Sequence, residues 1–259
     1  MNKTIAVLGC GKDVAKYLPV TMQTIKNVTN MFADYRVFIY ENDSKDITEQ
    51  LLVNYRKQDR KIIIKCEKWI TTKYPKVTWR IAYAREQLKS MLIKSNFIPD
   101  YVLIMDLDDV ANNVENGKRF VYNALNLEEY WDGIFPHLTY DFWAFRTKRI
   151  KYNYWEVLRH FGTYFPNFDI KKYLAGFKDD LVPDKNNLCA VTSSFNGIAL
   201  YKYNIYIRGT YSGVNNFFTM IPDVNLRSKI QPEECEHVNF HKSLGPNAKL
   251  KILHGFIYV

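Results

Sequence analysis

The chain has 259 residues, of which 47% are hydrophobic and 24% charged, as expected of a soluble globular protein with one large domain. Its formal charge of +9 favours an acidic partner, such as a nucleotide phosphate, an anionic membrane surface or nucleic acid. The four cysteines form no C-x-x-C pair and no segment is long and apolar enough to cross a bilayer, so we expect a cytoplasmic protein with free thiols and no zinc knuckle.

The first half of the chain predicts strands that alternate with helices. Apolar runs rich in β-branched and aromatic residues predict strands over residues 4–8, 35–40, 61–66 and 101–109. Helical spacing predicts helices over residues 13–31, 46–56 and 79–93, the first with Asp13 as its N-cap. This alternation indicates βαβ units and a mainly parallel central sheet flanked by helices, which is an α/β fold.

The second half is richer in aromatic residues and less regular. It predicts helices over residues 116–127 and 152–161, and an irregular polar stretch over 169–187. Strand patterns cover residues 131–136, 194–201, 233–241 and 250–255. Because there is no repeat or obvious linker, we predict a single domain over residues 1–259.

Three carboxylates follow the fourth predicted strand directly. The run YVLIMDLDD, residues 101–109, ends in Asp106, Asp108 and Asp109. Open α/β sheets bind ligands beyond the carboxyl ends of their strands, and Asp106 and Asp108 are expected on one face, where they repel each other unless a cation lies between them. Such oxygen ligands suit Mg²⁺ or Mn²⁺, with a substrate diphosphate completing the coordination. A solvated acidic turn is the alternative.

The first strand supports a different interpretation. It ends in the glycine turn VLGCGK, and the second strand ends at Glu41, as in sites where glycines admit a ligand and an acid holds a ribose hydroxyl. Val14 stands where a dinucleotide fingerprint needs a small residue, and the turn lacks the Gly-Lys-Ser/Thr of a P-loop. An S-adenosylmethionine-dependent methyltransferase remains the main enzymatic alternative.

The third candidate function is a non-catalytic basic binding module, which is disfavoured because the basic residues form no single stripe.

Four motifs together carry a family resemblance. They are DLDD at 106–109, YDFWAFR at 140–146, VTSSFNGIALYK at 191–202 and ECEHVNFH at 234–241. In this order they resemble nucleotide-sugar-dependent glycosyltransferases with the GT-A fold, and within them the capsule-associated α-1,3-mannosyltransferase group. The resemblance implies a single domain in which residues 1–110 bind a nucleotide sugar and residues 111–259 bind the acceptor.

The resemblance also implies an activity and partners. We expect a metal-dependent enzyme that moves a hexose from a UDP- or GDP-sugar to a hydroxyl of a glycan acceptor, with Mn²⁺ or Mg²⁺ holding the donor diphosphate. Nucleic acid is not an expected partner. The basic surface is compatible with peripheral association with a membrane.

Donor and metal roles follow from position and resemblance. The expected metal ligands are Asp106, Asp108 and His254, of which His254 is similar to a terminal His-Gly ligand of related transferases. The expected donor-binding residues are Leu8, Gly9, Glu41, Asn42, Ser44, Arg80, Arg85, Asp106 and Leu107. The arginines suit planar phosphate groups, although an exposed helix face would explain them equally well. A structural histidine is the alternative for His254.

Catalytic and acceptor-binding roles fall on the later motifs. Glu236, Glu234 and Asp141 are candidates for the carboxylate that activates or orients the acceptor, and the sequence leaves open whether the reaction inverts or retains configuration. The expected acceptor-binding residues are Trp143, Arg146, Asn196 and Gly197. A core position for Trp143 and a β-bulge at Gly197 are the structural alternatives.

Overall fold

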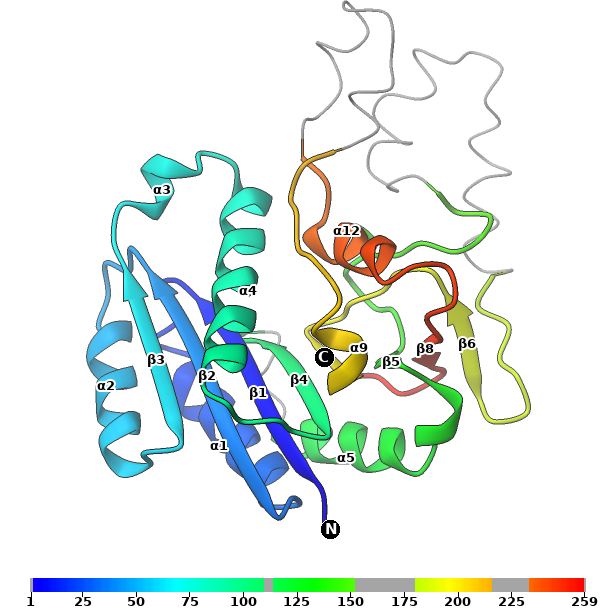
Figure 1. Cartoon of the computed structure of the whole chain (residues 1–259), viewed down its shortest axis with the longest axis horizontal. Helices are drawn as coiled ribbons and strands as arrows, with labels where there is room; N and C mark the ends of the chain where they lie inside the picture. Colours follow the sequence, from blue (N-terminus) through cyan, green and yellow to red (C-terminus); the bar gives the residue numbers. More distant parts are fainter. Residues whose placement is uncertain (1, 110–113, 152–179, 216–232, 259) are drawn as a thin grey trace, which may run out of the picture.

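The computed structural model describes residues 2–109, 114–151, 180–215 and 233–258. Its described strands form one eight-stranded sheet in the order β3-β2-β1-β4-β7-β5-β8-β6 (Figure 1). The first four strands of this order are mutually parallel, whereas β7 runs antiparallel to both β4 and β5. The predicted α/β class with a mainly parallel sheet is therefore confirmed.

The strands and helices have the following bounds. The strands are β1 Thr4–Gly11, β2 Asp34–Asn42, β3 Ile62–Glu67, β4 Tyr101–Asp106, β5 Gly133–Phe135, β6 Leu188–Val191, β7 Ile198–Lys202 and β8 Leu250–Leu253. The helices are α1 Leu18–Thr29, α2 Thr48–Gln58, α3 Ile70–Lys73, α4 Val77–Lys94, α5 Val114–Leu125, α9 Tyr203–Tyr206 and α12 Glu236–Ser243, with a 3₁₀ turn at Glu128–Tyr130.

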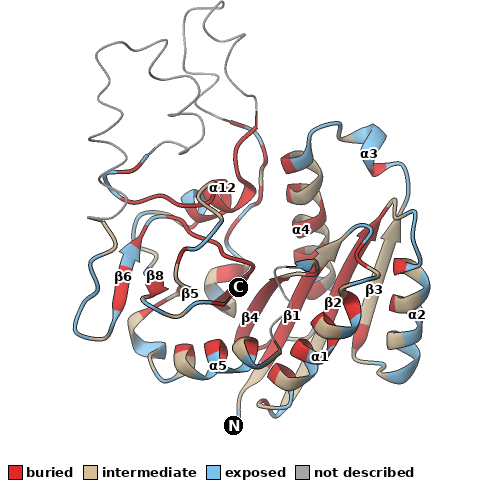
Figure 2. Cartoon of the chain, turned by 180° about the vertical axis from the view of Figure 1, so that it is seen from behind, coloured by how far each residue is buried: buried red, intermediate tan, exposed pale blue. Residues whose placement is uncertain are grey.

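Helices cover both faces of the sheet, and the strands are buried between them (Figure 2). Side chains alternate along a strand, so β1 directs Ala6 and Leu8 toward α4 and directs Ile5 and Val7 toward α1, α2 and α5. All four side chains are fully buried. This burial on both faces explains why the strands of the first half are continuous apolar runs.

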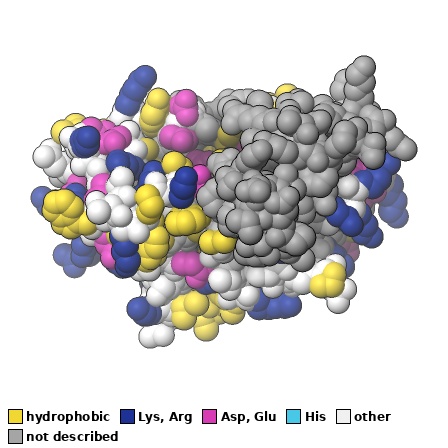
Figure 3. Space-filling view, turned by 90° about the horizontal axis from the view of Figure 1, so that it is seen from above, with side chains coloured by type: hydrophobic (Ala, Val, Ile, Leu, Met, Phe, Trp, Pro, Cys, Tyr) yellow, Lys and Arg dark blue, Asp and Glu magenta, His cyan; other side chains and the backbone are white. Residues whose placement is uncertain are grey.

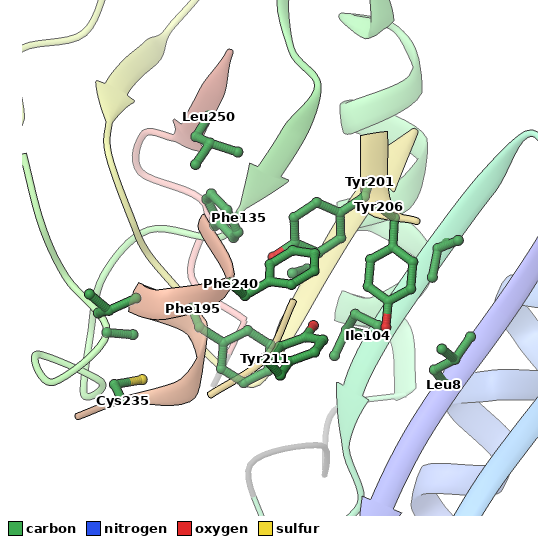
Figure 4. Packing of buried hydrophobic residues seen from close by; sticks show 14 of the residues in the cluster. Leu8, Ile104, Phe135, Phe195, Tyr201, Tyr206, Tyr211, Cys235, Phe240 and Leu250 are labelled. Carbon is green, nitrogen blue, oxygen red and sulfur yellow. The ribbon is translucent and has the colours of Figure 1, made fainter. Parts of the chain in front are cut away.

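A second layer of aromatic residues fixes α12 against the sheet. Tyr201, Tyr206, Tyr211 and Phe240 gather between α12 and β4 (Figure 4), and the rings of Tyr211 and Phe240 stack with centroids 4.3 Å apart. Aromatic side chains contribute large buried areas, so this cluster holds the first turn of α12 near the carboxyl end of β4.

The expectation of a strand over residues 233–241 was wrong, because residues 236–243 form helix α12. Val238 and Phe240 alternate with polar residues, which imitates a strand. Residues 236–241 are all buried, so no exposed polar face reveals the helical period of 3.6. An acidic residue in the first turn and a lysine in the last turn agree with the helix dipole.

The first helix also begins later than expected. Asp13 has a left-handed backbone, with φ of 55°, and does not cap a helix. Helix α1 starts at Leu18 with Pro19 in its first turn, where proline is tolerated. Strands β1 and β2 continue beyond their predicted ends, to Gly11 and Asn42.

Strand β6 and helices α3 and α9 were not predicted. The helix expected over residues 152–161 and most of the irregular stretch expected over 169–187 lie outside the described residues.

The order of the strands creates a crevice at the end of β1. The chain passes from β1 outward through β2 and β3 and then returns to β4 on the other side of β1. In register, Cys10 of β1 lies opposite Asp106 of β4. Such a switch point is where open α/β sheets bind ligands.

Two expectations concern the chain as a whole. All four cysteines lie within the described residues and are free thiols, as predicted. In the part of the chain that the structure describes, no helix combines the length and the apolar character needed to span a bilayer.

Candidate active site

A cavity of about 500 Å³ opens at the switch point between β1 and β4. Its walls come from the turn after β1, the first turns of α4, the segment after β4 and the first turn of α12. The lining residues that carry chemistry are Cys10, Lys12, Asp13, Asn42, Arg80, Arg85, Asp106, Asp108, Tyr140, Asp141, Trp143, Glu236 and His237. Segments that are distant in the sequence therefore meet in one concave site.

Arg85 lies at the centre of the charged groups. Its Nε donates a hydrogen bond to Glu236 Oε1 over 2.9 Å, and its Nη2 donates to Asp106 Oδ1 over 3.1 Å. The side chain is only 3% exposed, and its guanidinium lies 5.1 Å from the ring centroid of Phe195. Nη1 is buried and has no hydrogen-bond partner among the described residues. Arg85 thus links the acidic strand end to the first turn of α12.

The environment of Asp106 disfavours the charged form of its carboxyl group. Burial raises its pKa to about 7, with the carboxylates of Asp108 and Glu236 adding to the increase and Arg85 opposing it. Its second oxygen, Oδ2, has the Tyr140 hydroxyl at 3.5 Å, a long hydrogen bond. Carboxylates that raise each other's pKa favour a shared proton or a cation between them.

Asp141 has a similar environment on the opposite wall. Burial and the nearby Glu236 raise the pKa of Asp141 to about 7, while a hydrogen bond from the backbone N–H of Ala144 opposes the increase. A carboxylate whose pKa lies near neutrality is suited to accept and release a proton.

His237 is buried directly behind Glu236. Its ring stacks on Phe195 with centroids 3.9 Å apart, and it is 1% exposed. Burial lowers its pKa well below the ordinary value, as do Arg85 and His241, so the imidazole is neutral. Neither ring nitrogen has a hydrogen-bond partner among the described residues.

Many of the site residues that the sequence predicts do line this cavity. They are Asn42, Arg80, Arg85, Asp106, Leu107, Asp108, Asp141, Trp143 and Glu236. Arg85 differs from its expected role as a donor contact on a helix face, because its hydrogen bonds to Glu236 and Asp106 both go to protein carboxylates. Arg80 is less buried and donates to the carbonyl oxygens of Tyr74 and Pro75.

Leu8 and Gly9, expected to contact the donor, lie outside the cavity. Leu8 is fully buried in the core on the α4 face. A Cβ atom at Gly9 would lie 2.6 Å from Leu107 Cδ2, so the glycine allows Leu107 to pack against β1. Neither position supports direct contact with a ligand.

Glu41 and Ser44, also expected at the donor, are hydrogen-bonded to each other beside the cavity. The Glu41 carboxylate is fully buried, and its Oε1 accepts a hydrogen bond from the backbone N–H of Ser44. The Ser44 hydroxyl accepts one from the backbone N–H of Asp13. Because β2 continues through Glu41, the carboxylate points into the protein, which does not support contact with a ribose.

Glu234, Arg146, Asn196 and Gly197 also lie behind the cavity wall. Arg146 Nη2 donates to Glu234 Oε1 over 2.9 Å, and both side chains are less than 10% exposed. Asn196 is fully buried and donates to the carbonyl oxygen of His137. Gly197, with φ of 80°, accepts a hydrogen bond from the backbone N–H of Asp106 through its carbonyl oxygen. These four residues hold the site in shape and do not line it.

His254 does not join the two aspartates. It follows β8, and β7 and β5 lie between β8 and β4, which separates the strand ends by roughly 14 Å at the usual strand spacing. Its ring lies against His137, with centroids 5.0 Å apart. Among the described residues, no three His, Cys, Asp or Glu side chains form a group that could hold a metal ion. The structure therefore corrects the three-ligand expectation.

Asp106 and Asp108 nevertheless suit a hard divalent cation. Their oxygen atoms are the ligand type that Mg²⁺ and Mn²⁺ prefer, and Mg²⁺ is usually held by one or two carboxylates together with substrate phosphates. Burial raises the pKa of Asp106, with Asp108 and Glu236 adding to the increase, and a cation bound beside these carboxylates would favour their charged forms.

Sequence analysis did not identify several lining residues. Lys12 and Tyr17 lie in the turn between β1 and α1, where only the glycines attracted attention. Cys10 was considered only as a free thiol, because it follows the predicted strand over residues 4–8 and its place within β1 was not foreseen. Its register opposite Asp106 becomes visible only once the two strands pair.

Comparisons with known proteins give distant structural similarity. No family model matches the chain, and no curated protein matches it. The chain is similar to S. aureus TarS 1-349, with 11% identity, a TM-score of 0.45, and coverage of 98% of this chain and 58% of that chain. It is also similar to M. tuberculosis glucosyl-3-phosphoglycerate synthase, with 12% identity, a TM-score of 0.42, and coverage of 79% and 58%. The chain thus spans less than two thirds of either, and similarity this distant assigns neither family nor function.

Proposed function

We propose that the chain is a metal-dependent glycosyltransferase of the GT-A type that moves a hexose from a nucleoside-diphosphate sugar to a hydroxyl of a glycan acceptor. The observation that carries this proposal is the convergence of Asp106, Asp108, Asp141 and Glu236 on one cavity at the switch point of the sheet. Residues 1–110 would form the nucleotide-binding half, and residues 111–259 the acceptor half.

The motif segments support the proposal by meeting in space. Each of the four contributes to the cavity wall, through Asp106 to Asp108, then Tyr140, Asp141 and Trp143, then Phe195, and finally Cys235 to His237. A set of motifs that merely stabilised the core would not need to share one concave surface. Their shared surface fits a common substrate.

The charge balance of the cavity supports the need for a cation. Five carboxylates line it against three basic side chains, those of Lys12, Arg80 and Arg85. A nucleoside diphosphate carries several negative charges and would be repelled by this lining. A divalent cation held by Asp106 and Asp108 would neutralise the leaving diphosphate, which is the chemistry that such a metal supplies.

The protein groups have separate tasks in this scheme. Lys12 and Arg80 lie on the wall where phosphate oxygens would bind. Asp141 and Glu236 are the candidate proton acceptors for the acceptor hydroxyl, and Arg85 fixes the orientation of Glu236. Trp143 supplies an aromatic face for a sugar ring. Whether one carboxylate removes a proton or only orients the acceptor depends on the stereochemical outcome.

Methyl transfer from S-adenosylmethionine gains no support from the site. The acid expected to hold the ribose, Glu41, is buried outside the cavity, and Gly9 packs beneath Leu107. Both features that suggested methyl transfer thus have structural roles.

The test is thermal unfolding of the purified protein with UDP, GDP, CDP or S-adenosylmethionine, each with and without Mn²⁺. A ligand at a concentration well above its dissociation constant raises the stability of the native state by mass action. We expect one nucleoside diphosphate to raise the melting temperature by about 5 °C or more, and only with Mn²⁺.

Matched variants make this test specific. Asp108→Asn is expected to abolish the metal-dependent shift and glycosyl transfer while the unliganded protein melts normally. Asp109→Asn, which removes a neighbouring exposed carboxylate, should retain both. A metal-independent shift with S-adenosylmethionine, or full transferase activity of Asp108→Asn or in EDTA, would refute the proposal.

A further inference from the structure

The segment 68–77, which we call the α3 segment, presents apolar and basic side chains at the edge of the sheet where the cavity opens. It connects the end of β3 to the start of α4 and contains the short helix α3 (Figure 1). Trp69 is 79% exposed and Val77 is 53% exposed. The segment is among the exposed parts of the chain in Figure 2. An indole this exposed contributes little to folding.

The position of Trp69 is fixed by the backbone beneath it. Trp69 has φ of 68°, which is unfavourable for a residue with a bulky side chain. Asp43 holds this conformation, because its Oδ1 accepts a hydrogen bond from the Trp69 N–H over 2.6 Å and its Oδ2 accepts one from the Thr71 N–H over 2.8 Å. A strained backbone kept in place by two hydrogen bonds to Asp43, with its side chain in solvent, indicates a functional surface.

The charge of the α3 segment has one sign. Lys68, Lys73 and Lys76 are exposed, and no acidic residue occurs between Lys68 and Arg85 in the sequence. Lys68 pairs with Glu49. Within the described residues, neither Lys73 nor Lys76 forms an ion pair, and Lys73 lies 5.3 Å from the ring centroids of both Tyr74 and Tyr83. Figure 3 views this side of the molecule, where basic and hydrophobic side chains lie next to one another.

We propose that the α3 segment docks the protein on the surface of an anionic lipid bilayer. An indole prefers the boundary between headgroups and acyl chains, and lysines extend their aliphatic stems along an apolar surface while the ammonium groups contact anionic headgroups. Trp69, Lys73 and Lys76 do not line the cavity, so these three side chains can be changed without altering its wall.

The composition of the α3 segment favours a bilayer over nucleic acid. The segment contains no arginine, which is the residue suited to bidentate contacts with phosphate and base edges. Val77 is an exposed apolar side chain. Its transfer from water to the apolar boundary of a bilayer is favourable, whereas contact with a phosphate backbone would not bury it in an apolar environment. Val77 also lines the cavity, so docking through the α3 segment would place the cavity opening beside the membrane.

The experiment is co-sedimentation of the full chain with vesicles of phosphatidylcholine alone or mixed with phosphatidylglycerol. We expect binding only to the anionic vesicles, weakened by added salt. Trp69→Ala should reduce the partition coefficient about tenfold, because most of the indole would leave the apolar boundary. Lys73→Gln together with Lys76→Gln should reduce it by about fivefold for each lysine.

Matched control variants lie near the amino ends of the strands, before β3 and before β4. Ile98→Ala removes an apolar side chain that is 74% exposed, and Lys57→Gln with Lys94→Gln removes two exposed lysines. Both controls should bind vesicles as the unaltered protein does. Absence of binding to anionic vesicles, equal losses in the controls, or equally tight and Trp69-dependent binding to single-stranded DNA would each overturn the proposal. Nucleotide-dependent thermal shifts are a separate measurement, so either proposal can fail alone.

Discussion

At the scale of single residues, Arg85 is the group on which the candidate site depends most. Removing its guanidinium leaves the buried Glu236 and the partly buried Asp106 without their counter-charge. Breaking a buried ion pair from one side costs about 3–5 kcal/mol, so Arg85→Met is expected to lower the free energy of unfolding by that amount. Arg80→Met, which loses two hydrogen bonds to backbone carbonyls, should cost no more than about 2 kcal/mol. Urea unfolding at neutral pH measures both, and equal losses would contradict the central role of Arg85.

Asp141 gives a prediction about pH. Burial and Glu236 raise its pKa to about 7 in the folded protein, above the ordinary value of 3.8. The folded state therefore binds this proton more tightly, and its contribution to stability declines as pH rises from about 4 to about 7. Asp141→Asn removes this titration and retains the oxygen that accepts the Ala144 hydrogen bond. The variant should be about 4 kcal/mol more stable than the unaltered protein at pH 8, and similar to it at pH 4. A difference that does not change with pH would contradict this assignment.

The sequence predicts acidic groups better than it predicts their partners. Asp106 and Asp108 could be found because an apolar run ends in them, which is a local pattern. The contact of Arg85 with Glu236 joins residues 151 positions apart and exists only because α12 packs beside α4. Glu41 was misplaced for a related reason, since a residue at the apparent end of a strand pattern can still belong to the strand and face the interior.

At the scale of elements, the described segment that follows α9 and contains Gly213 holds α4 in place. Gly213 lies so close to the first turn of α4 that an added Cβ would be 2.5 Å from the backbone carbonyl carbon and oxygen of Thr78. The Thr78 hydroxyl also donates to the Gly213 carbonyl oxygen. This contact sets the position of Arg80 and Arg85 relative to α12.

Gly213→Ala is therefore expected to destabilise the protein by about 2–3 kcal/mol, because a backbone neighbour cannot move aside as a side chain can. Val214→Ala, one residue further and 43% exposed, is the matched control and should change stability by less than about 0.5 kcal/mol. Chemical unfolding of both variants checks the prediction. A loss for Val214→Ala as large as that for Gly213→Ala would show that the close approach does not matter.

Element types were predictable where the sequence shows either a continuous apolar run or polar residues at helical spacing. Strands β1 to β4 are apolar along their length, and α2 and α4 expose polar residues at helical spacing, so their existence follows from the sequence. Helix α12 has no exposed face to produce a period, and the alternation of Val238 and Phe240 imitates a strand. Strand β6 is four residues long, and its partner β8 is distant in the sequence, so nothing local marks it.

At the scale of the whole molecule, the net charge and the charge of the candidate site have opposite signs. The chain carries +9, while carboxylates outnumber basic side chains in the cavity. The excess of positive charge therefore lies elsewhere on the protein, and the α3 segment carries part of it. The overall charge predicts attraction to an anionic partner or surface, whereas only the structure separates that attraction from the acidic cavity.

The continuity of the sheet gives the last prediction. Strands β4 and β7 pair over five residues and join the parallel half to the mixed half, and core residues pack across this boundary on both faces. We expect one cooperative thermal transition, in which calorimetric and van't Hoff enthalpies agree. Leu52→Ala in α2 and Ile252→Ala in β8 each remove a fully buried side chain, at a cost of about 2–5 kcal/mol, and should lower the same transition. Two transitions, each moved by only one variant, would instead divide the chain at the β4 and β7 pairing.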